Sequence, residues 1–308
     1  MESTFERITS QLKADGYYSQ AVSIGHIKDL QNEIVGRKEE HLFDTDFYKE
    51  RLIHFSFQVP DTLKEAKSLI VVAIPSAQTP LKFHWAGTTI KLVLPPTYRG
   101  YNQTIQKIEE NLGKLLAPEG FRVVPARLPQ KLLAVHSGLA EYGRNNITYI
   151  SGLGSFYQPT VFFSDMPVEE DCWLEPRMMA RCESCKACLI KCPTGAIAED
   201  RFLLHAERCL VFHNERSASQ PFPDWIKQGA HNSIMGCMLC QQFCPEDRPF
   251  LDWFEGGEEF NEEETTMLLS GIEKKLLPGI TREKLERLEL LDDLEKLPRN
   301  LGILLRRT

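Results

Sequence analysis

Eight of the nine cysteines in this 308-residue chain stand in two runs with related spacing. The runs are Cys182-x2-Cys185-x2-Cys188-x3-Cys192-Pro193 and Cys209, followed later by Cys237-x2-Cys240-x3-Cys244-Pro245. A cubane iron–sulfur cluster needs four thiolates, and a C-x2-C-x2-C loop can reach three of its iron corners. The doubled pattern therefore predicts two [4Fe–4S] clusters in a chain that carries electrons.

The proline that ends each run indicates how the ligands are shared. In two-cluster ferredoxins the cysteine before this proline ligates the other cluster. Cluster I is therefore assigned Cys182, Cys185, Cys188 and Cys244, and cluster II is assigned Cys192, Cys209, Cys237 and Cys240. The second run departs from a simple ferredoxin repeat, because an insertion has moved Cys209 far upstream.

Other uses of these cysteines are disfavoured. Zinc sites close with four ligands and have no need of two C-x3-C-P endings. Disulfides need an oxidising compartment, and residues 1–6 lack the basic and apolar regions of a signal peptide, so we expect a cytoplasmic protein. Cys172, next to Trp173, lies outside both runs and is expected to be a buried or spare thiol.

Composition limits the remaining possibilities. A chain of 308 residues with 42% hydrophobic content can bury a full core and divide into two or three units. Its net charge of −7 and its lack of a dense Lys/Arg block argue against nucleic-acid binding. No apolar run reaches the roughly 20 residues needed to span a bilayer, so no membrane segment is predicted.

The region before the cysteines alternates between strand and helix patterns. Its first 60 residues look helical and polar, and the unbroken β-branched run 68–74 predicts a strand covered on both faces. Further strands are predicted at 88–94, 121–124, 147–150 and 160–163, and helices at 102–116 and 130–142. This alternation indicates an α/β or α+β layer structure whose strand order stays open.

A small helical layer is predicted after the cysteines. Asn261 is a plausible N-cap, with glutamates in the first turn behind it. Thr281 is predicted to cap a later helix that Pro298 ends. We therefore expect an α/β core at 1–169, a ferredoxin-like two-cluster domain at 170–250 and a C-terminal helical segment at 251–308.

One segment before the cysteines carries a family resemblance. It is Leu133-Ala-Val-His-Ser-Gly-Leu-Ala-Glu-Tyr-Gly-Arg-Asn-Asn146, followed by Gly154-Ser155-Phe156 and Ser164-Asp165-Met166-Pro167. With the doubled cysteine runs, it resembles the epoxyqueuosine reductases and, more distantly, the reductive dehalogenases. The early strand 69–73 and Pro298-Arg299-Asn300-Leu301 match as well, so the resemblance covers most of the chain and is most specific over about 130–250.

The resemblance implies a cobalamin-binding core related to the flavin nitroreductase fold, joined to the ferredoxin-like domain. The clusters would take electrons from a ferredoxin or flavodoxin and pass them to cobalt, because cluster potentials can be tuned very low. The cofactor would perform the reductive chemistry on a small-molecule or corrinoid substrate, and the protein would orient it.

One departure from the family pattern bears on the substrate. Epoxyqueuosine reductases carry an acidic residue, taken as the proton donor, where this chain has Val124–Gln130 without a carboxylate. We therefore predict an iron–sulfur reductase whose substrate is not epoxyqueuosine in tRNA. The alternatives are an electron-transfer or activation protein that reduces a partner, and a core that binds flavin, for which the chain offers no diagnostic motif.

The same segment supplies the candidate site residues. Tyr142 and Arg144 are the catalytic candidates, because a cation beside a tyrosine favours the phenolate and lets the hydroxyl protonate an anion. Otherwise Tyr142 packs and Arg144 lies on the surface. The cofactor-binding candidates are His136, Gly138, Gly143, Asn145, Asn146, Gly154 and Ser155. His136 is alternatively a satisfied core histidine, and the two asparagines alternatively shape a turn.

Overall fold

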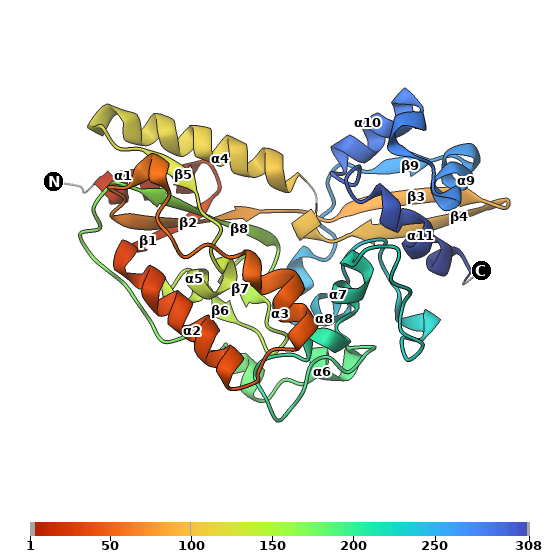
Figure 1. Ribbon diagram of the computed structural model, residues 1–308, viewed down its shortest axis with the longest axis horizontal. Helices are drawn as coiled ribbons and strands as arrows, with labels where there is room; N and C mark the ends of the chain where they lie inside the picture. Colours follow the sequence, from red (N-terminus) through yellow and green to blue (C-terminus); the bar gives the residue numbers. More distant parts are fainter. Residues whose placement is uncertain (1–3, 99, 307–308) are drawn as a thin grey trace. The chain divides into compact units, whose positions relative to one another are not determined.

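The computed structural model describes residues 4–98 and 100–306, and the chain divides into two compact units (Figure 1). The first unit comprises 1–75 and 102–186, and the second comprises 76–101 and 187–308. The bounds of these units differ from those of the three segments predicted from the sequence, because residues 76–101 fold with the C-terminal part of the chain. Residues 1–3, used in the signal-peptide prediction, lie outside the described part.

The first unit is built on a four-stranded antiparallel sheet. Its strands, in spatial order, are β1 (Tyr18–Ser23), β2 (Ser68–Pro75), β8 (Tyr157–Ser164) and β5 (Val123–Pro125). The β2–β8 register sets Leu69 opposite Phe163 and Val71 opposite Val161. Residues 68–74 of β2 are all buried, which confirms the prediction of a strand covered on both faces.

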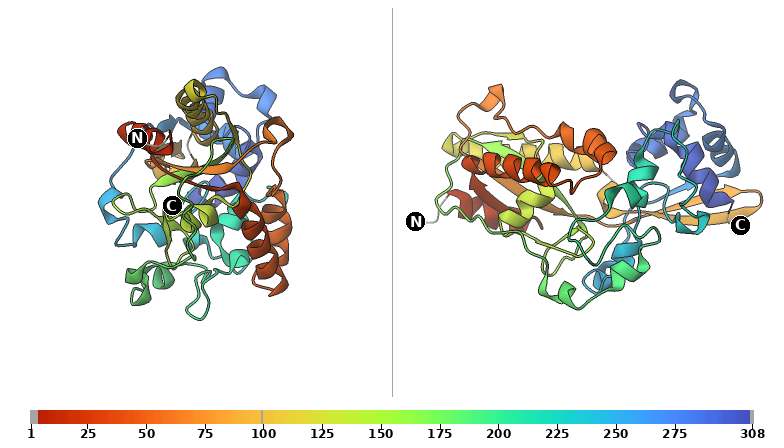
Figure 2. Two further views of the ribbon diagram at one scale, coloured as in Figure 1. Left: turned by 90° about the vertical axis from the view of Figure 1, so that its left-hand side faces the viewer. Right: turned by 60° about the horizontal axis from the view of Figure 1, so that its bottom comes forward.

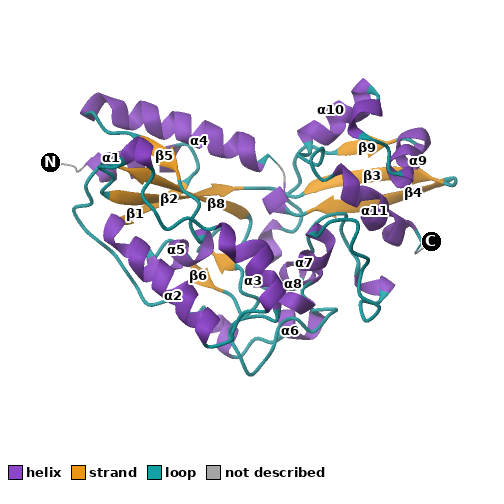
Figure 3. Ribbon diagram, viewed as in Figure 1, coloured by secondary structure: helices purple, strands orange, loops and turns teal. Residues whose placement is uncertain are grey.

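Helices cover both faces of this sheet (Figure 3). On one face α1 (Thr4–Ala14) and α4 (Tyr101–Leu116) bury leucines and isoleucines against Ile70, Val72 and Phe162. On the other, α5 (Gln130–His136) contacts β2 and β8. The remaining helices of the unit are α2 (Ile27–Glu39) and α3 (Thr45–Arg51). The antiparallel strands with layered helices make this unit an α+β structure.

A short hairpin follows α5. Its strands are β6 (Glu141–Tyr142) and β7 (Thr148–Tyr149), paired antiparallel. The prediction of a helix over 130–142 was wrong beyond His136, because Gly138 takes the left-handed conformation with φ +74° and the chain turns there. The hairpin places Tyr142 at the end of a strand and Arg144 in the turn between the strands.

The second unit contains a three-stranded sheet, seen from two further directions in Figure 2. The strands β3 (Thr79–Trp85) and β4 (Thr88–Leu94) form an antiparallel hairpin, and β9 (Glu258–Phe260) pairs parallel with β3. The predicted strand 88–94 is confirmed. The sequence reading missed β3, where Pro80 interrupts the alternating pattern.

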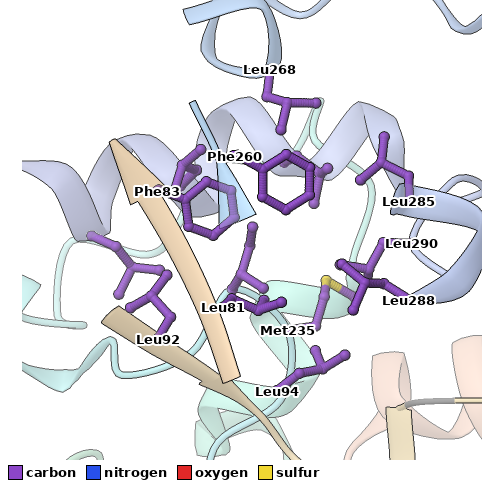
Figure 4. Close-up of a cluster of buried hydrophobic side chains, with 14 of the residues drawn as sticks. Leu81, Phe83, Leu92, Leu94, Met235, Phe260, Leu268, Leu285, Leu288 and Leu290 are labelled. Atoms are coloured by element: carbon purple, nitrogen blue, oxygen red, sulfur yellow. The ribbon is translucent and has the colours of Figure 1, made fainter. Parts of the chain in front are cut away.

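The C-terminal helices pack on this sheet. They are α9 (Glu262–Ser270), α10 (Gly279–Arg287) and α11 (Leu297–Leu305). Figure 4 shows the core between them, in which the rings of Phe83 and Phe260 stack with centroids 4.8 Å apart. Leu268, Leu285 and Leu301 surround this pair, so the predicted helical layer shares its core with a sheet.

The ends of these helices test the predicted caps. Asn261 caps α9 and forms a capping box with Glu264, which confirms that prediction. The prediction for Thr281 was wrong, because α10 already begins at Gly279 and the Thr281 hydroxyl, buried, donates to Glu264 Oε1 at 3.0 Å. Pro298 lies in the first turn of α11 rather than ending a helix, since a proline there loses no helical hydrogen bond.

Three short helices lie in the cysteine region of this unit. They are α6 (Ala187–Lys191), α7 (Leu210–Glu215) and α8 (Leu239–Gln242). Among the described residues, none of the helices combines the length and apolar character that a membrane span requires.

Candidate cluster site and candidate cofactor segment

Five cysteines of the second unit lie close enough to influence one another. Cys240 is affected by the charges of Cys237, Cys209, Cys188 and Cys192, and Cys209 by those of Cys237 and Cys192. These thiols include all four that the sequence assigns to cluster II, together with Cys188, which it assigns to cluster I. The fold therefore gathers Cys209 with the other three although it stands 28 positions before Cys237.

Burial disfavours the ionised form of three of these thiols. Removal of the sulfur from water, together with the neighbouring thiols, raises the pKa of Cys209 to about 12 and raises the pKa of Cys237 and Cys240. Burial also acts on Cys192, but hydrogen bonds from Thr194, Ile197 and Ala196 outweigh it and lower its pKa. A coordinating metal deprotonates a thiol outright, so these buried thiols are suited to become cluster ligands.

Hydrogen-bond donors point at two of these sulfurs. The Ala196 backbone N–H donates to Cys192 Sγ at 3.3 Å, and the Asn232 side-chain amide donates to Cys237 Sγ at 3.1 Å. Donors of this kind stabilise thiolate ligands and are one of the means by which proteins set cluster potentials. The donor set and the thiol set both fit a [4Fe–4S] cluster.

A single metal ion makes a different geometric demand. Within residues 4–98 and 100–306, no three His, Cys, Asp or Glu side chains converge as the ligands of one ion do.

Arg144 holds the first cysteine loop within the first unit. Its guanidinium donates to three backbone carbonyls, those of Cys182 at 2.6 Å, Cys185 at 3.1 Å and Glu183 at 3.3 Å. The residues of cluster I divide between the units, since Cys182 and Cys185 belong to the first and Cys188 and Cys244 to the second. The complete ligand set of cluster I therefore stays a prediction.

The β6–β7 turn presents Arg144 to that loop. Gly143 N–H donates to the Ile147 carbonyl at 2.7 Å, and Asn146 adopts φ +57°. A Cβ on Gly143 would stand 2.5 Å from the Tyr149 ring, so only glycine fits there. Asn145 accepts from Ile147 N–H at 3.2 Å and donates to the Tyr149 hydroxyl at 2.8 Å. Both asparagines thus shape the turn.

The surroundings of Tyr142 affect the pKa of its hydroxyl. Burial raises the pKa of its hydroxyl, and the charges of Arg37 and Glu33 on α2 act on it in opposite directions. The cation that lowers this pKa is Arg37, where the sequence suggested Arg144, and burial outweighs its effect. Tyr142 therefore remains protonated at neutral pH, and its catalytic role stays a prediction.

His136 is buried and engaged on both ring nitrogens. Nδ1 donates to the Leu174 carbonyl at 2.7 Å, and Nε2 lies 2.8 Å from Glu33 Oε2. Its ring also stacks on Trp173 with centroids 4.1 Å apart, and His26 stacks on the opposite side of that indole at 4.0 Å. These contacts are those of a satisfied core histidine.

The remaining candidates lie in turns of the same unit. Gly138 packs closely, since an added Cβ would meet Leu174 Cδ1 at 3.2 Å, and Gly154 has φ +64°. Ser155 is buried. Cys172 is exposed, which corrects the expectation of a buried thiol and leaves that of a spare one.

Comparison with known proteins assigns the cysteine region. Residues 181–247 match the model of the "4Fe-4S double cluster binding domain" family, and all eight cysteines of the two runs fall within this range. The chain therefore carries a domain for two [4Fe–4S] clusters.

Curated relatives extend the match beyond that domain. An epoxyqueuosine reductase of Atelocyanobacterium thalassa is 29% identical over 198 residues, which are 63% of this chain and 63% of that protein. One from Pseudomonas aeruginosa is 30% identical over 148 residues, which are 47% of this chain and 39% of that protein. The chain is similar in sequence to the epoxyqueuosine reductases. It spans less than two thirds of the length of these relatives.

The fold agrees with this assignment. The structure of epoxyqueuosine reductase from Streptococcus thermophilus superposes with a TM-score of 0.70 over 98% of this chain and 80% of that one, at 18% identity. An epoxyqueuosine reductase structure with a modified tRNA-Tyr stem loop gives a TM-score of 0.56 over 90% and 81% of the two chains, at 19% identity. The chain thus shares the mixed α/β fold of these reductases.

Sequence reasoning missed the side chains that support the cysteine loops. Asn214, Asn232 and Asn300 hold backbone or sulfur atoms around Cys237, and Arg299 donates to five carbonyls of residues 213–220. In the sequence, Arg299-Asn300 stands out only as part of the resemblance to the reductase family. No local pattern marks such residues, since each acts on atoms distant in the sequence.

Proposed function

We propose that this chain is an iron–sulfur reductase that takes single electrons from a ferredoxin or flavodoxin and conducts them through its two clusters to a corrinoid. Its first unit would provide the corrinoid-binding core, related to the flavin nitroreductase fold. The observation that carries the proposal is the gathering of Cys192, Cys209, Cys237 and Cys240 in a domain of the double-cluster family. Similarity to the epoxyqueuosine reductases supports the reductase class.

The proposal that the chain binds a corrinoid rests on the resemblance of residues 133–146 to the reductase family. One structural observation limits this proposal. His136, Arg144 and Asn145 are each bonded to protein groups of their own unit. These side chains therefore do not fit direct binding of a corrinoid in this conformation. The proposal consequently contains no chemical step at cobalt and assigns these three residues to the support of the unit.

We further propose that the substrate is a small molecule or a corrinoid and is not epoxyqueuosine in tRNA. The stretch from the end of β5 at Pro125 to the start of α5 at Gln130 carries no carboxylate. A net charge of −7 also disfavours a polyanionic RNA.

Iron content and spectra test the cluster part of the proposal. Anaerobic reconstitution of the full chain should give about eight irons per chain and the EPR signals of two reduced cubanes. About four irons, or bound zinc in their place, would contradict it.

Titration tests the corrinoid part. The chain is mixed anaerobically with cob(II)alamin, and the EPR and visible spectra should change on binding. Unchanged spectra would refute a corrinoid while leaving the clusters in place. In that event, the absorption of the untreated protein distinguishes a flavin from a cluster-only form, and a stably co-purifying protein without turnover would indicate an electron carrier.

The substrate proposal has its own assay. A tRNA stem loop carrying epoxyqueuosine is incubated with the reduced chain, with the Streptococcus thermophilus reductase as the positive control. We expect conversion by the control and none by this chain. Formation of queuosine by this chain would overturn the proposal.

A further inference from the structure

Asn232 connects directly to a ligand sulfur of the second unit. Its amide nitrogen donates to Cys237 Sγ at 3.1 Å and to the Ala230 carbonyl at 3.0 Å, while its Oδ1 accepts from Met238 N–H at 3.2 Å. These bonds fix the amide orientation, because a flipped amide would turn an oxygen toward both the sulfur and the Ala230 carbonyl. Asn232 therefore presents a fixed donor to Cys237.

Two further asparagines anchor the loop between Asn232 and Cys237. Asn214 pairs with both backbone groups of Gly236, donating to its carbonyl at 2.6 Å and accepting from its N–H at 3.2 Å. Asn300 Nδ2 donates to the Asn214 carbonyl at 2.9 Å and to the Ile234 carbonyl at 2.8 Å. All three asparagines thus limit how far Cys237 can move.

Close packing adds a further constraint at the residue before the cysteine. Gly236 has φ +74°, and a Cβ there would lie 2.4 Å from the ring of Tyr98. The Tyr98 hydroxyl donates to Glu215, which ends α7. Since α7 begins directly after Cys209, the same network reaches a second ligand of the cluster.

We infer that Asn232 is a positioning residue that raises the reduction potential of the cluster ligated by Cys237, through its hydrogen bond to the ligand sulfur. A reduced cluster carries one more negative charge than an oxidised one, and a donor on the thiolate stabilises that added charge. Burial strengthens the effect, because the hydrogen bond acts in a medium of low dielectric.

This inference depends on the double-cluster domain and not on the corrinoid or the substrate. Failure of the corrinoid titration would leave the inference intact, and the reverse also holds.

The test is an EPR-monitored redox titration of the reconstituted full chain. The variant Asn232→Asp keeps the acceptor for Met238 N–H but places an oxygen where the donor was, and Asn232→Ala removes the side chain without adding charge. Each should shift one of the two midpoint potentials downward and leave the other in place. Unmoved potentials, or an equal shift of both, would refute the inference.

Ser233→Ala is the matched control. Ser233 is buried in the same loop, and its hydroxyl bonds to the Val93 carbonyl at 2.7 Å and the Met235 carbonyl at 2.6 Å without contacting a sulfur. This variant weakens the loop but leaves the Cys237 donor. If its potential falls as far as that of the Asn232 variants, the effect is structural and the inference fails.

A second readout covers loss of cluster stability. Resonance Raman spectra report the iron–cysteine stretching bands directly, and loss of a donor to one sulfur should shift these bands in Asn232→Asp but not in Ser233→Ala. If neither Asn232 variant retains both clusters while Ser233→Ala does, Asn232 is needed for assembly rather than for tuning, and the inference is overturned.

Discussion

The two cysteine loops are supported by different chemistry. In the first unit one cation, Arg144, donates directly to the carbonyls of Cys182 and Cys185. In the second unit neutral amides hold the loop before Cys237, and the cation Arg299 acts at residues 213–220, several positions after Cys209.

The two cysteine loops differ in the number of side chains that hold them. Removal of a single guanidinium that serves three carbonyls takes the charged donor from all three at once, and the two part-buried acceptors lose most by it. A network of several amides loses only part of its bonds with any one substitution. The first loop should therefore depend on one residue, and the second on several.

Cys209→Ser should have the largest effect and separates the two clusters. Loss of one of four thiolates should remove the second cluster, so iron content should fall from about eight to about four per chain. The first cluster should keep its EPR signal because none of its assigned ligands changes. Cys172→Ser, at an exposed cysteine outside both runs, should retain all the iron. Loss of both clusters in Cys209→Ser would contradict the ligand assignment.

Arg144→Ala should have the second-largest effect, and this effect should fall on the first cysteine loop. Removal of the guanidinium should destabilise the first unit by about 1.5–3 kcal/mol, the usual loss for hydrogen bonds to a charged group. The first cluster should lose iron faster under a chelator, which iron release kinetics can measure. Arg177→Ala removes an exposed ion pair with Glu141 and should cost less than about 1 kcal/mol. Equal iron loss in the two variants would show that Arg144 does not hold the loop.

Arg299→Ala should lower stability by a comparable amount with less effect on iron. The guanidinium donates to five carbonyls and lies 4.5 Å from the centre of the Phe222 ring, but none of its acceptors is a cysteine. Arg299→Lys should not restore stability, because an ammonium cannot reproduce the planar fork. Thermal unfolding and iron release measure the two effects, with the exposed Arg306→Ala as control. If Arg299→Ala loses more iron than Arg144→Ala, the first cysteine loop is not the one that depends on a single cation.

Glu264→Gln should have the smallest effect, visible as a pH dependence of the second unit. Burial raises the pKa of Glu264, but bonds from Lys284, the Asn261 N–H and Thr281 outweigh it and hold the pKa below 4.5. A depressed carboxyl pKa contributes stability above the unfolded value, and this contribution is lost as the pH falls through the folded value. The gap in unfolding midpoint between wild type and variant should therefore shrink between pH 6 and pH 3, conditions that span the ~4.5 reference pKa.

Glu263→Gln is the matched control for that series, because Glu263 is exposed in the same helical turn. The difference in unfolding midpoint between Glu263→Gln and wild type should stay small and constant with pH. A constant gap for Glu264→Gln as well would show that the ion pair with Lys284 contributes no pH-dependent stability.

Several elements could be predicted because their signals are local. The β-branched run of β2, the amphipathic pattern of α4 and the Asn261 cap each lie within a few residues of the structure they specify. Failures arose where a local signal was ambiguous. Pro298 can end one helix or begin the next, and Pro80 weakened an otherwise alternating strand.

The candidate site divides in the same way. Cysteine spacing gave the cluster type, because a cluster loop is a local motif, and it predicts both ligand sets. The roles of Arg144 and His136 could not be read, since Arg144 acts on carbonyls 38 to 41 residues away and His136 on a carboxylate 103 residues away. A sequence offers no sign of such distant partners.

By itself, then, the sequence determined that this protein carries two clusters, and it related the chain to the reductases, because spacing and short motifs are properties of neighbouring residues. Only the tertiary structure decided which side chains support those clusters. Folding brings Asn232 to a sulfur, Asn300 to the loop before Cys237, and Arg144 to the loop of Cys182. Hydrogen bonds act over about 3 Å in space, whatever the separation along the chain.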